Sequence, residues 1–290
     1  MTKAAIAIGS NSTRLLALRA SGEALRARAD TRLMLGLTPE GTLTPEAIEY
    51  TAEAVRDLMS QARAFGAERV ALYATSAARD AKNGDVFAQR LKDLTGLKLN
   101  ILPGEDEARL AFLAASRGRE CAVLDIGGGS TELSFGRNNE IACLMTAQAG
   151  ASRMYKMRPI CSMTDARWVC ERATEVLTST CGALLARPRP ALLIGIGGTC
   201  PTAAAITMKV DRHDEMIEGA ALTLDDVKGQ LAMLAPMTPD ERARVRGLYP
   251  SRKYIMPHGL CILYAVMTMF HFDALTVSVR NNLDALILEA

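Results

Sequence analysis

The sequence predicts an α/β fold built from two related halves. Each half opens with a strand, a glycine-rich turn and a second strand: residues 9–12 follow the apolar run 4–8, and residues 125–132 follow the apolar run 121–124. Strands then alternate with helical patterns in both halves, which is typical of α/β domains. The chain has 290 residues, of which 49% are hydrophobic, so it is long enough for two domains with separate cores.

The first half is expected to alternate strands with helices. Thr44 suits an N-cap and Pro45 suits the first helical position, and apolar residues then recur at helical spacing up to Gly66. The other expected elements are the hairpin strands 4–8 and 15–19, the strands 69–74 and 97–102, and the helices 85–94 and 105–115.

The second half repeats the opening hairpin and continues with more helices. Pro188 and Pro190 close a long amphipathic helix, and Gly197-Gly198-Thr199 opens another helix after a strand. The expected strands are 121–125, 131–135, 141–147, 191–195 and 274–279, and the expected helices are 164–185, 224–234, 239–246, 258–270 and one from Asn282.

The domain boundary is expected near residues 118–120, directly before the second strand–turn–strand unit. It gives an N-terminal domain of residues 1–119 and a C-terminal domain of residues 120–290. The last helix is a candidate for packing back on the first domain.

Composition excludes some function classes. The formal net charge is +2, which argues against broad nucleic-acid binding and leaves small anions open as ligands. The longest apolar run, about residues 260–270, is too short to span a bilayer, and the N-terminus shows no signal-peptide pattern. Seven scattered cysteines without a Cys-x-x-Cys pair indicate reduced thiols rather than a zinc site. We therefore expect a cytoplasmic protein without nucleic-acid or membrane partners.

Five segments in order resemble the exopolyphosphatase/guanosine pentaphosphatase (Ppx/GppA) family, and in particular its short, two-domain members. They are residues 8–15 (IGSNSTRL), 74–83 (ATSAARDAKN), 104–110 (GEDEARL), 124–133 (LDIGGGSTEL) and 195–199 (GIGGT). The resemblance implies two ribonuclease-H-like lobes around a cleft, as in the actin, sugar-kinase and heat-shock ATPase superfamily. It also implies hydrolysis of a phosphoanhydride with Mg²⁺, and it permits a homodimer.

The resemblance assigns roles to individual residues. Glu107 matches the glutamate that activates the attacking water, and a carboxylate within one hydrogen bond can position and deprotonate that water. Asp125 and Glu132 match the acids that flank the second turn, where they could hold Mg²⁺. The residues expected to bind phosphate through N–H, hydroxyl or guanidinium groups are Gly9, Ser10, Asn11, Ser12, Arg14, Arg79, Gly127, Gly128, Gly129, Ser130, Thr131, Gly197, Gly198 and Thr199.

Each of these residues also has a purely structural interpretation. The alternatives are a solvated first-turn glutamate for Glu107, a loop cap for Asp125, an exposed strand position for Glu132, a surface salt bridge for Arg79 and a strand-edge charge for Arg14. His258 lies in a further segment, 252–259, that resembles the family, and we expect it to be structural rather than catalytic.

Ala7 stands where the family usually has an aspartate, two residues before the first glycine. A carboxylate there would hold Mg²⁺ through water or position the nucleophile. Its loss predicts weaker activity, altered metal use, or binding without catalysis. Tyr254 and residues 282–285 also depart from the family pattern.

The leading hypothesis is an exopolyphosphatase, which releases terminal phosphate from inorganic polyphosphate with Mg²⁺ and water activated by Glu107. The close alternative is removal of the 5′-phosphate of guanosine pentaphosphate. Two hypotheses from other classes stay open at this point: a non-catalytic polyphosphate- or nucleotide-binding sensor, and a sugar-kinase-like transferase.

Overall fold

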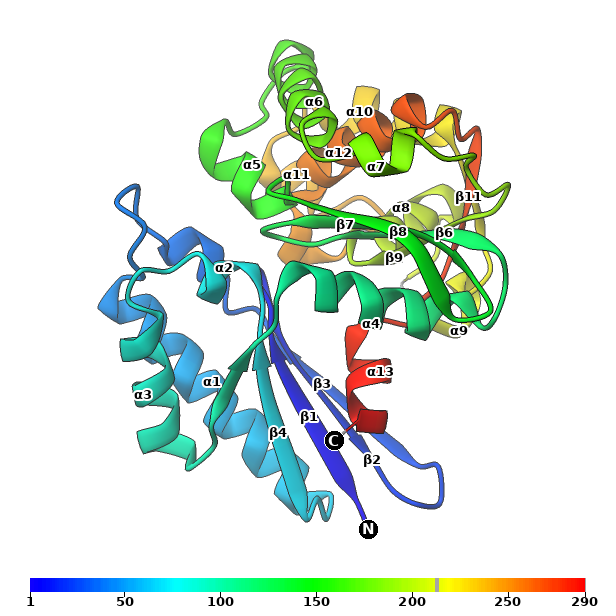
Figure 1. Cartoon of the computed structure of the whole chain (residues 1–290). Helices are drawn as coiled ribbons and strands as arrows, with labels where there is room; N and C mark the ends of the chain where they lie inside the picture. Colours follow the sequence, from blue (N-terminus) through cyan, green and yellow to red (C-terminus); the bar gives the residue numbers. More distant parts are fainter. Residues whose placement is uncertain (212–213, 290) are drawn as a thin grey trace. The chain divides into compact units, whose positions relative to one another are not determined.

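The computed structural model describes residues 1–211 and 214–289 (Figure 1). The chain divides into two compact units, which we call unit 1 (Met1–Glu107 with Asn282–Ala290) and unit 2 (Ala108–Asn281). No helix in the described ranges is both long enough and apolar enough to cross a membrane.

Unit 1 is built on a five-stranded sheet with the order β3-β2-β1-β4-β5. The first three strands are antiparallel neighbours, whereas β4 runs parallel to β1 and β5 runs parallel to β4. The strands are β1 (Lys3–Ile8), β2 (Thr13–Leu18), β3 (Ala24–Ala29), β4 (Arg69–Ala74) and β5 (Leu99–Ile101). The helices are η1 (Leu33–Gly36), α1 (Pro45–Ala64), α2 (Ser76–Arg79), α3 (Gly84–Thr95) and the C-terminal α13 (Asn282–Glu289).

The core of unit 1 lies between the sheet and α1. The Thr44 side chain caps α1 by accepting a hydrogen bond from Ala47 N, and Pro45 occupies the first helical position as expected. Ile6 and Ile8 of β1 share one buried apolar cluster with the inward face of α1. Because side chains alternate along a strand, Ala7 projects from the other face of the sheet. The last helix, α13, packs on β1 and β2.

Unit 2 is built on a six-stranded sheet with the order β10-β11-β9-β6-β7-β8. Its strands are β6 (Cys121–Ile126), β7 (Thr131–Arg137), β8 (Glu140–Ala147), β9 (Leu193–Gly197), β10 (Ala221–Thr223) and β11 (Ala274–Val277). Its helices are α5 (Ala151–Met157), α6 (Met163–Thr178), α7 (Gly182–Leu185), α8 (Thr199–Met208), α9 (Asp214–Ile217), α10 (Leu224–Leu234), α11 (Pro239–Arg242), η2 (Pro250–Arg252) and α12 (Met256–Met269).

The two sheets share one topology. The series β8-β7-β6-β9-β11 repeats the order and the strand directions of β3-β2-β1-β4-β5, and β10 adds one antiparallel strand at the edge. This is the ribonuclease-H-like arrangement, so the α/β fold class predicted from the sequence is confirmed for both units. In unit 2 it places a glycine-rich turn between β6 and β7, and in unit 1 it places the matching turn between β1 and β2.

The unit limits differ from the expected domain limits of 1–119 and 120–290. The division falls between Glu107 and Ala108, inside α4 (Gly104–Ser116). Packing explains this position, because α4 buries Phe112 and its neighbours in a cluster with Val123 of β6 and Ile194 of β9. Most of α4 therefore belongs with the second sheet.

Several elements depart from the sequence-based expectations. The strands β3 and β10 and the helices α2 and α5 were not expected, and the predicted helices 164–185 and 239–246 are interrupted or shorter in the structure. β3 was missed because Arg26 and Arg28 dilute its apolar pattern, although Leu25, Ala27 and Ala29 pack on the unit 1 core.

Candidate active site

The turn between β1 and β2 is closed by its own backbone. Gly9 N donates to Ser12 O over 3.0 Å. Two carbonyls of the turn accept from the segment that precedes and opens η1: Ser10 O accepts from Met34 N at 2.9 Å, and Asn11 O accepts from Arg32 N at 3.0 Å. These bonds fix the orientation of successive peptide planes in the turn.

Peptide geometry then sets where the N–H groups of this turn point. In a trans peptide the N–H lies opposite the preceding carbonyl, and the described chain has no cis bond. Asn11 N–H and Ser12 N–H therefore point away from the η1 segment, and neither donates to another described residue. Asn11 Nδ2 is also buried without a partner among residues 1–211 and 214–289. The turn thus has unused donors, as an anion site requires.

The turn between β6 and β7 has the same closure and a firmer support. Gly127 N donates to Ser130 O over 3.0 Å. Gly127 O accepts from the first residue of α5, Gly128 O accepts from the next two, and Gly129 O accepts from Arg153 Nε at 2.7 Å. By the same peptide geometry, the N–H groups that follow these carbonyls, those of residues 128–130, point away from α5. None of them donates within the described residues, so they form a row of free donors.

Arg153 is a supporting residue that the sequence analysis did not identify. Its guanidinium holds Gly129 O, and its backbone N–H holds Gly128 O. The close approach also requires Gly150, because a Cβ at that position would collide with the backbone of Gly128 and Gly129. The glycine turn is therefore clamped by α5. An arginine shortly after a glycine turn is too common to have predicted this contact.

The two hairpins differ in the side chains that flank their turns. Asp125 of β6 lies directly opposite Glu132 of β7, and Thr146 Oγ1 donates to Glu132 Oε1 at 3.1 Å. Glu132 is 3% exposed, so it does not occupy the exposed strand position that was its structural alternative. In unit 1 the corresponding positions hold Ala7 opposite Arg14. Directly opposed residues have Cβ atoms about 5 Å apart, so each hairpin presents its pair on one face.

The end of β9 completes the polar group in unit 2. Gly197 has φ +82°, and a Cβ on it would lie 2.2 Å from Asp125 Oδ1, too close for both atoms to stay in place. A Cβ on Gly198 would collide with the guanidinium of Arg252, whose Nη2 lies 3.4 Å from Thr199 Oγ1. The predicted turn 197–199 is thus in contact with a carboxylate on one side and a guanidinium on the other.

Arg252 is a buried site residue to which the sequence analysis gave no role. Its segment, 252–259, was noted for its resemblance to the family, but sequence spacing could not place the guanidinium on Gly198. Arg252 is 4% exposed. Nearby, burial raises the pKa of the Cys200 thiol to about 12; Asp125 adds to this shift and Arg252 opposes it. Cys200 is therefore a neutral core thiol and not a nucleophile.

Glu107 lies in the first turn of α4 and is 6% exposed. Arg79 Nη1 donates to Glu107 Oε1 at 2.5 Å and to Leu102 O at 2.6 Å. The interpretation of Glu107 as a solvated first-turn residue is therefore wrong. Arg79 forms an ion pair, but a partly buried one, and its contact with phosphate stays a prediction.

Within unit 1, hydrogen bonds connect the first turn to this ion pair. Ser10 Oγ accepts from Ala77 N at 3.2 Å in α2, and α2 ends at Arg79. Arg14 Nε reaches back to Ser12 Oγ at 3.4 Å. The structure thus brings together the unit 1 residues that the sequence singled out, and it separately brings together those of unit 2.

Mg²⁺ was expected at Asp125 and Glu132. Among the described residues no three His, Cys, Asp or Glu side chains form a ligand cluster. Mg²⁺ characteristically takes only one or two carboxylates and completes its shell with water and substrate phosphates. The opposed pair fits that donor set, and the absence of a Cβ at position 197 leaves room for the Asp125 carboxylate.

Known proteins resemble this chain over its whole length. A model of the Ppx/GppA phosphatase family matches residues 22–282. Exopolyphosphatase 2 of Mycobacterium tuberculosis is 30% identical, over 98% of this chain and 97% of its own length. A guanosine-5'-triphosphate,3'-diphosphate pyrophosphatase of Photobacterium profundum is 27% identical over 95% of this chain, which spans 56% of that protein.

Solved structures have the same fold. A crystal structure of an exopolyphosphatase-like protein superposes with a TM-score of 0.90 at 24% identity, over 100% of this chain and 98% of that one. The Aquifex aeolicus Ppx/GppA enzyme superposes with a TM-score of 0.79 at 26% identity, over 100% of this chain and 99% of that one. The resemblance first seen in five short segments is therefore confirmed, and the chain belongs to the Ppx/GppA phosphatase family.

Proposed function

We propose that this protein is an exopolyphosphatase that hydrolyses the terminal phosphoanhydride bond of inorganic polyphosphate. The observation that carries the proposal is the row of N–H groups of residues 128–130, held away from α5 beside the opposed carboxylates Asp125 and Glu132. Backbone donors in that arrangement bind phosphoryl oxygens, and the carboxylates suit a divalent cation that accompanies them.

The chemistry needs a water molecule that attacks the terminal phosphorus while the bridging P–O bond breaks. The products are orthophosphate and a chain one phosphate shorter. Glu107 is assigned as the residue that orients this water and accepts its proton. Its ion pair with Arg79 and the bond from Arg79 to Leu102 O fix the direction of the carboxylate.

Phosphoryl charge would be balanced by groups from the chain. In unit 2 the N–H groups of residues 128–130 and the buried Arg252 beside Gly198 supply donors and positive charge. In unit 1 the turn of residues 9–12 would supply N–H donors, and Arg14 next to it would supply positive charge. Bound Mg²⁺, held by Asp125 and Glu132, would neutralise charge on the substrate oxygens.

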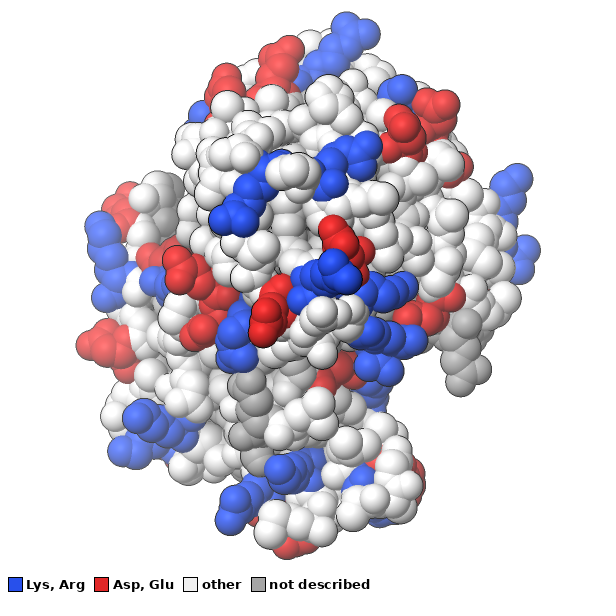
Figure 2. All heavy atoms as spheres, turned by 45° about the vertical axis from the view of Figure 1, so that its right-hand side comes forward, with Lys and Arg blue, Asp and Glu red and all other residues white. Residues whose placement is uncertain are grey.

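Guanosine pentaphosphate is the second candidate substrate, because a relative that covers 95% of this chain is named for that nucleotide class. Polyphosphate is preferred because the relative matched over nearly its full length is named an exopolyphosphatase. The face in Figure 2 carries Lys and Arg interspersed with Asp and Glu, so its charge is mixed rather than uniformly basic.

The proposal includes a cytoplasmic homodimer. All seven cysteines are free thiols, which supports a reducing compartment. The dimer is inferred from the family resemblance and is tested by sedimentation of the purified protein.

The deciding experiment is phosphate release from defined polyphosphate and from guanosine pentaphosphate, each with and without Mg²⁺. We expect Mg²⁺-dependent release from polyphosphate. Release only from the nucleotide would replace the leading substrate by the alternative. Tight binding of either compound without any release would favour the sensor hypothesis that Ala7 raised.

A further inference from the structure

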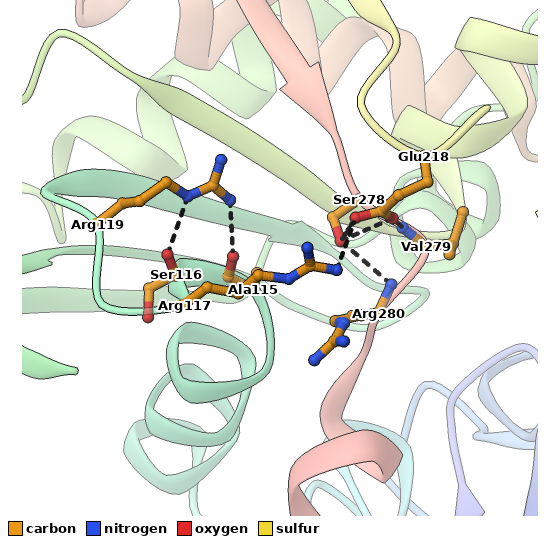
Figure 3. A network of polar contacts seen from close by, with 8 residues as sticks. All are labelled: Ala115, Ser116, Arg117, Arg119, Glu218, Ser278, Val279 and Arg280. Atoms are coloured by element: carbon orange, nitrogen blue, oxygen red, sulfur yellow. Dashed lines mark hydrogen bonds and ion pairs between the residues drawn. The ribbon is translucent and has the colours of Figure 1, made fainter. Parts of the chain in front are cut away.

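A network of polar contacts in unit 2, outside the glycine turns, contains three arginines and one glutamate: Arg117 reaches Glu218, and Arg119 lies at the other end of the network, on the end of α4 (Figure 3). Arg117 and Arg119 directly follow α4, and Arg280 follows β11. All three are exposed. Arg117 Nη2 lies 3.4 Å from Glu218 Oε1, so the glutamate is the meeting point of segments far apart in the sequence.

The supports of this arginine cluster are well defined. Glu218 accepts from Ser278 Oγ at 3.1–3.2 Å and from Val279 N at 2.7 Å, which fixes its carboxylate (Figure 3). Arg119 donates through Nε to Ser116 O and through Nη2 to Ala115 O, at the negative end of the α4 dipole. Two of the four charged side chains are therefore held in place by the backbone.

The cluster carries more positive than negative charge. The network holds one carboxylate and three guanidinium groups, an excess as large as the formal net charge of the whole chain, +2. The Arg280 guanidinium makes no hydrogen bond or ion pair with any residue of the described ranges; only its backbone N–H is used, by Ser278 Oγ at 3.3 Å. An exposed, unpaired guanidinium beside others is suited to an external anion.

One member of the network, Ser278, lies near the carboxylate pair along the same sheet. Ser278 extends β11 past Val277, which pairs with Gly195, and Ser278 N donates to Gly195 O at 2.9 Å. The next residue of β9, Ile196, pairs with Asp125. Since neighbouring strands are about 4.8 Å apart, Ser278 lies two strands, or roughly 10 Å, from Asp125. A short run of phosphates spans such a distance.

We propose that Arg117, Arg119 and Arg280 bind internal phosphates of a polyphosphate chain while its end is hydrolysed. This inference rests on the proposed function. An enzyme that removes only the terminal phosphate leaves the rest of a long chain to be bound or solvated, and guanidinium forks match the repeated phosphate oxygens. A compact nucleotide or a triphosphate offers no such extension, so the cluster would favour long chains over short ones.

The test compares initial rates on tripolyphosphate and on long-chain polyphosphate. The double variant Arg117→Ala/Arg280→Ala removes two guanidinium groups and leaves Arg119 to cap α4. We expect KM for the long chain to rise about tenfold, because two exposed charge contacts are lost. The values of kcat and of KM for tripolyphosphate should not change. An unchanged KM for the long chain, or equal increases for both substrates, would overturn the proposal.

Two further variants exclude a merely structural effect. Arg172→Ala removes a partly exposed arginine of α6 that pairs with Glu175, and it should leave both KM values unchanged. Glu218→Gln removes the opposing charge while its amide oxygen can still accept from Ser278 and Val279. It should lower KM for the long chain, whereas damage to the fold would raise it. A rise confined to the long chain in Glu218→Gln contradicts the charge argument.

Failure of the proposed function is recognised separately. If the wild-type protein releases phosphate from neither substrate, the hydrolase proposal fails and binding is measured directly. Long-chain polyphosphate is then titrated against the wild type and the double variant at increasing salt. The wild type should bind more tightly at low salt and lose affinity more steeply, because more ionic contacts are screened. Equal affinities and equal salt slopes would overturn the arginine cluster as a binding site.

Discussion

Asp125 and Glu132 lie directly opposite each other on β6 and β7, so both carboxylates project from one face of the unit 2 sheet. The same two positions of the unit 1 hairpin hold Ala7 and Arg14. Both turns close with the same backbone hydrogen bond, of 3.0 Å. The hairpins therefore differ in charge rather than in backbone, and the pattern suits a cation in unit 2 and an anion in unit 1.

We expect Asp125→Ala and Glu132→Ala to raise the Mg²⁺ concentration needed for half-maximal phosphate release by ~10-fold or more, because each would remove one of the two carboxylates proposed to hold the metal. The measurement is a Mg²⁺ titration of activity. Glu140→Ala, which removes an exposed carboxylate at the start of β8, is the matched control. If both variants titrate like the wild type, the two acids only cap the hairpin.

Glu107→Gln should abolish turnover and spare polyphosphate binding. The amide keeps the shape of the side chain and can still contact Arg79, but it cannot accept the proton of water, a loss of ~100-fold or more in rate. Glu105→Gln changes an exposed residue of the same helical turn and should leave both turnover and polyphosphate binding unchanged. Turnover of Glu107→Gln within about tenfold of wild type would exclude Glu107 as the base.

Gly197→Ala is expected to reduce both stability and activity. Position 197 has φ +82°, which costs a residue with a Cβ about 1 kcal/mol, and the added atom would also displace Asp125 Oδ1. Gly96→Ala isolates the first effect, because Gly96 has φ +72° with no atom within 4 Å of an added Cβ.

Urea unfolding of the two glycine variants gives their stabilities, and phosphate release gives their activities. Gly96→Ala should lose only about 1 kcal/mol and keep its activity. Equal effects of the two substitutions on stability and activity would show that the Asp125 contact has no consequence.

His258 predicts a pH dependence of folding stability. Burial lowers its pKa from 6.5 to about 4, and Nε2 donates to Arg158 O at 2.9 Å. In the unfolded chain His258 takes up a proton below pH 6.5, whereas in the folded chain it stays neutral until the pH falls to about 4. Stability is therefore complete above pH 6.5 and falls as the pH drops towards 4, by about 3 kcal/mol for this group.

Urea unfolding of the wild type and of His258→Gln across that pH range checks the prediction. The glutamine amide can donate to Arg158 O but does not titrate. The difference in unfolding free energy between the two proteins should therefore shrink as the pH falls. If the difference in unfolding free energy stayed constant across this pH range, His258 would not be the cause of the loss of stability at low pH.

The sequence predicted the repeated features of this fold and missed those that depend on tertiary contacts. Both glycine turns follow apolar strands, and that pattern was sufficient to predict two related α/β halves. β3 was missed because its alternate positions are arginines, and Arg252 was not assigned because its contact with Gly198 joins segments more than 50 residues apart. The burial of Glu107 could not be predicted from the sequence either, because its partner Arg79 comes from another helix and is itself bound to Leu102 O.

Ala7 is the position at which a single substitution tests the catalytic proposal most directly. It lies between Arg14 of β2 and Tyr73 of β4, in the place that Asp125 occupies in unit 2. Ala7→Asp would restore the carboxylate that the family usually has there, and Arg14 directly opposite would offset the added charge. We expect Mg²⁺-dependent hydrolysis to rise by ~10-fold with little change in polyphosphate affinity, because the carboxylate would help to hold the metal and the attacking water rather than the chain. Ala7→Asn has the same shape without the charge and should not raise the rate. A matching gain in Ala7→Asn, or no gain in Ala7→Asp, would mean that the missing carboxylate does not limit this enzyme and that its chemistry is arranged around Ala7.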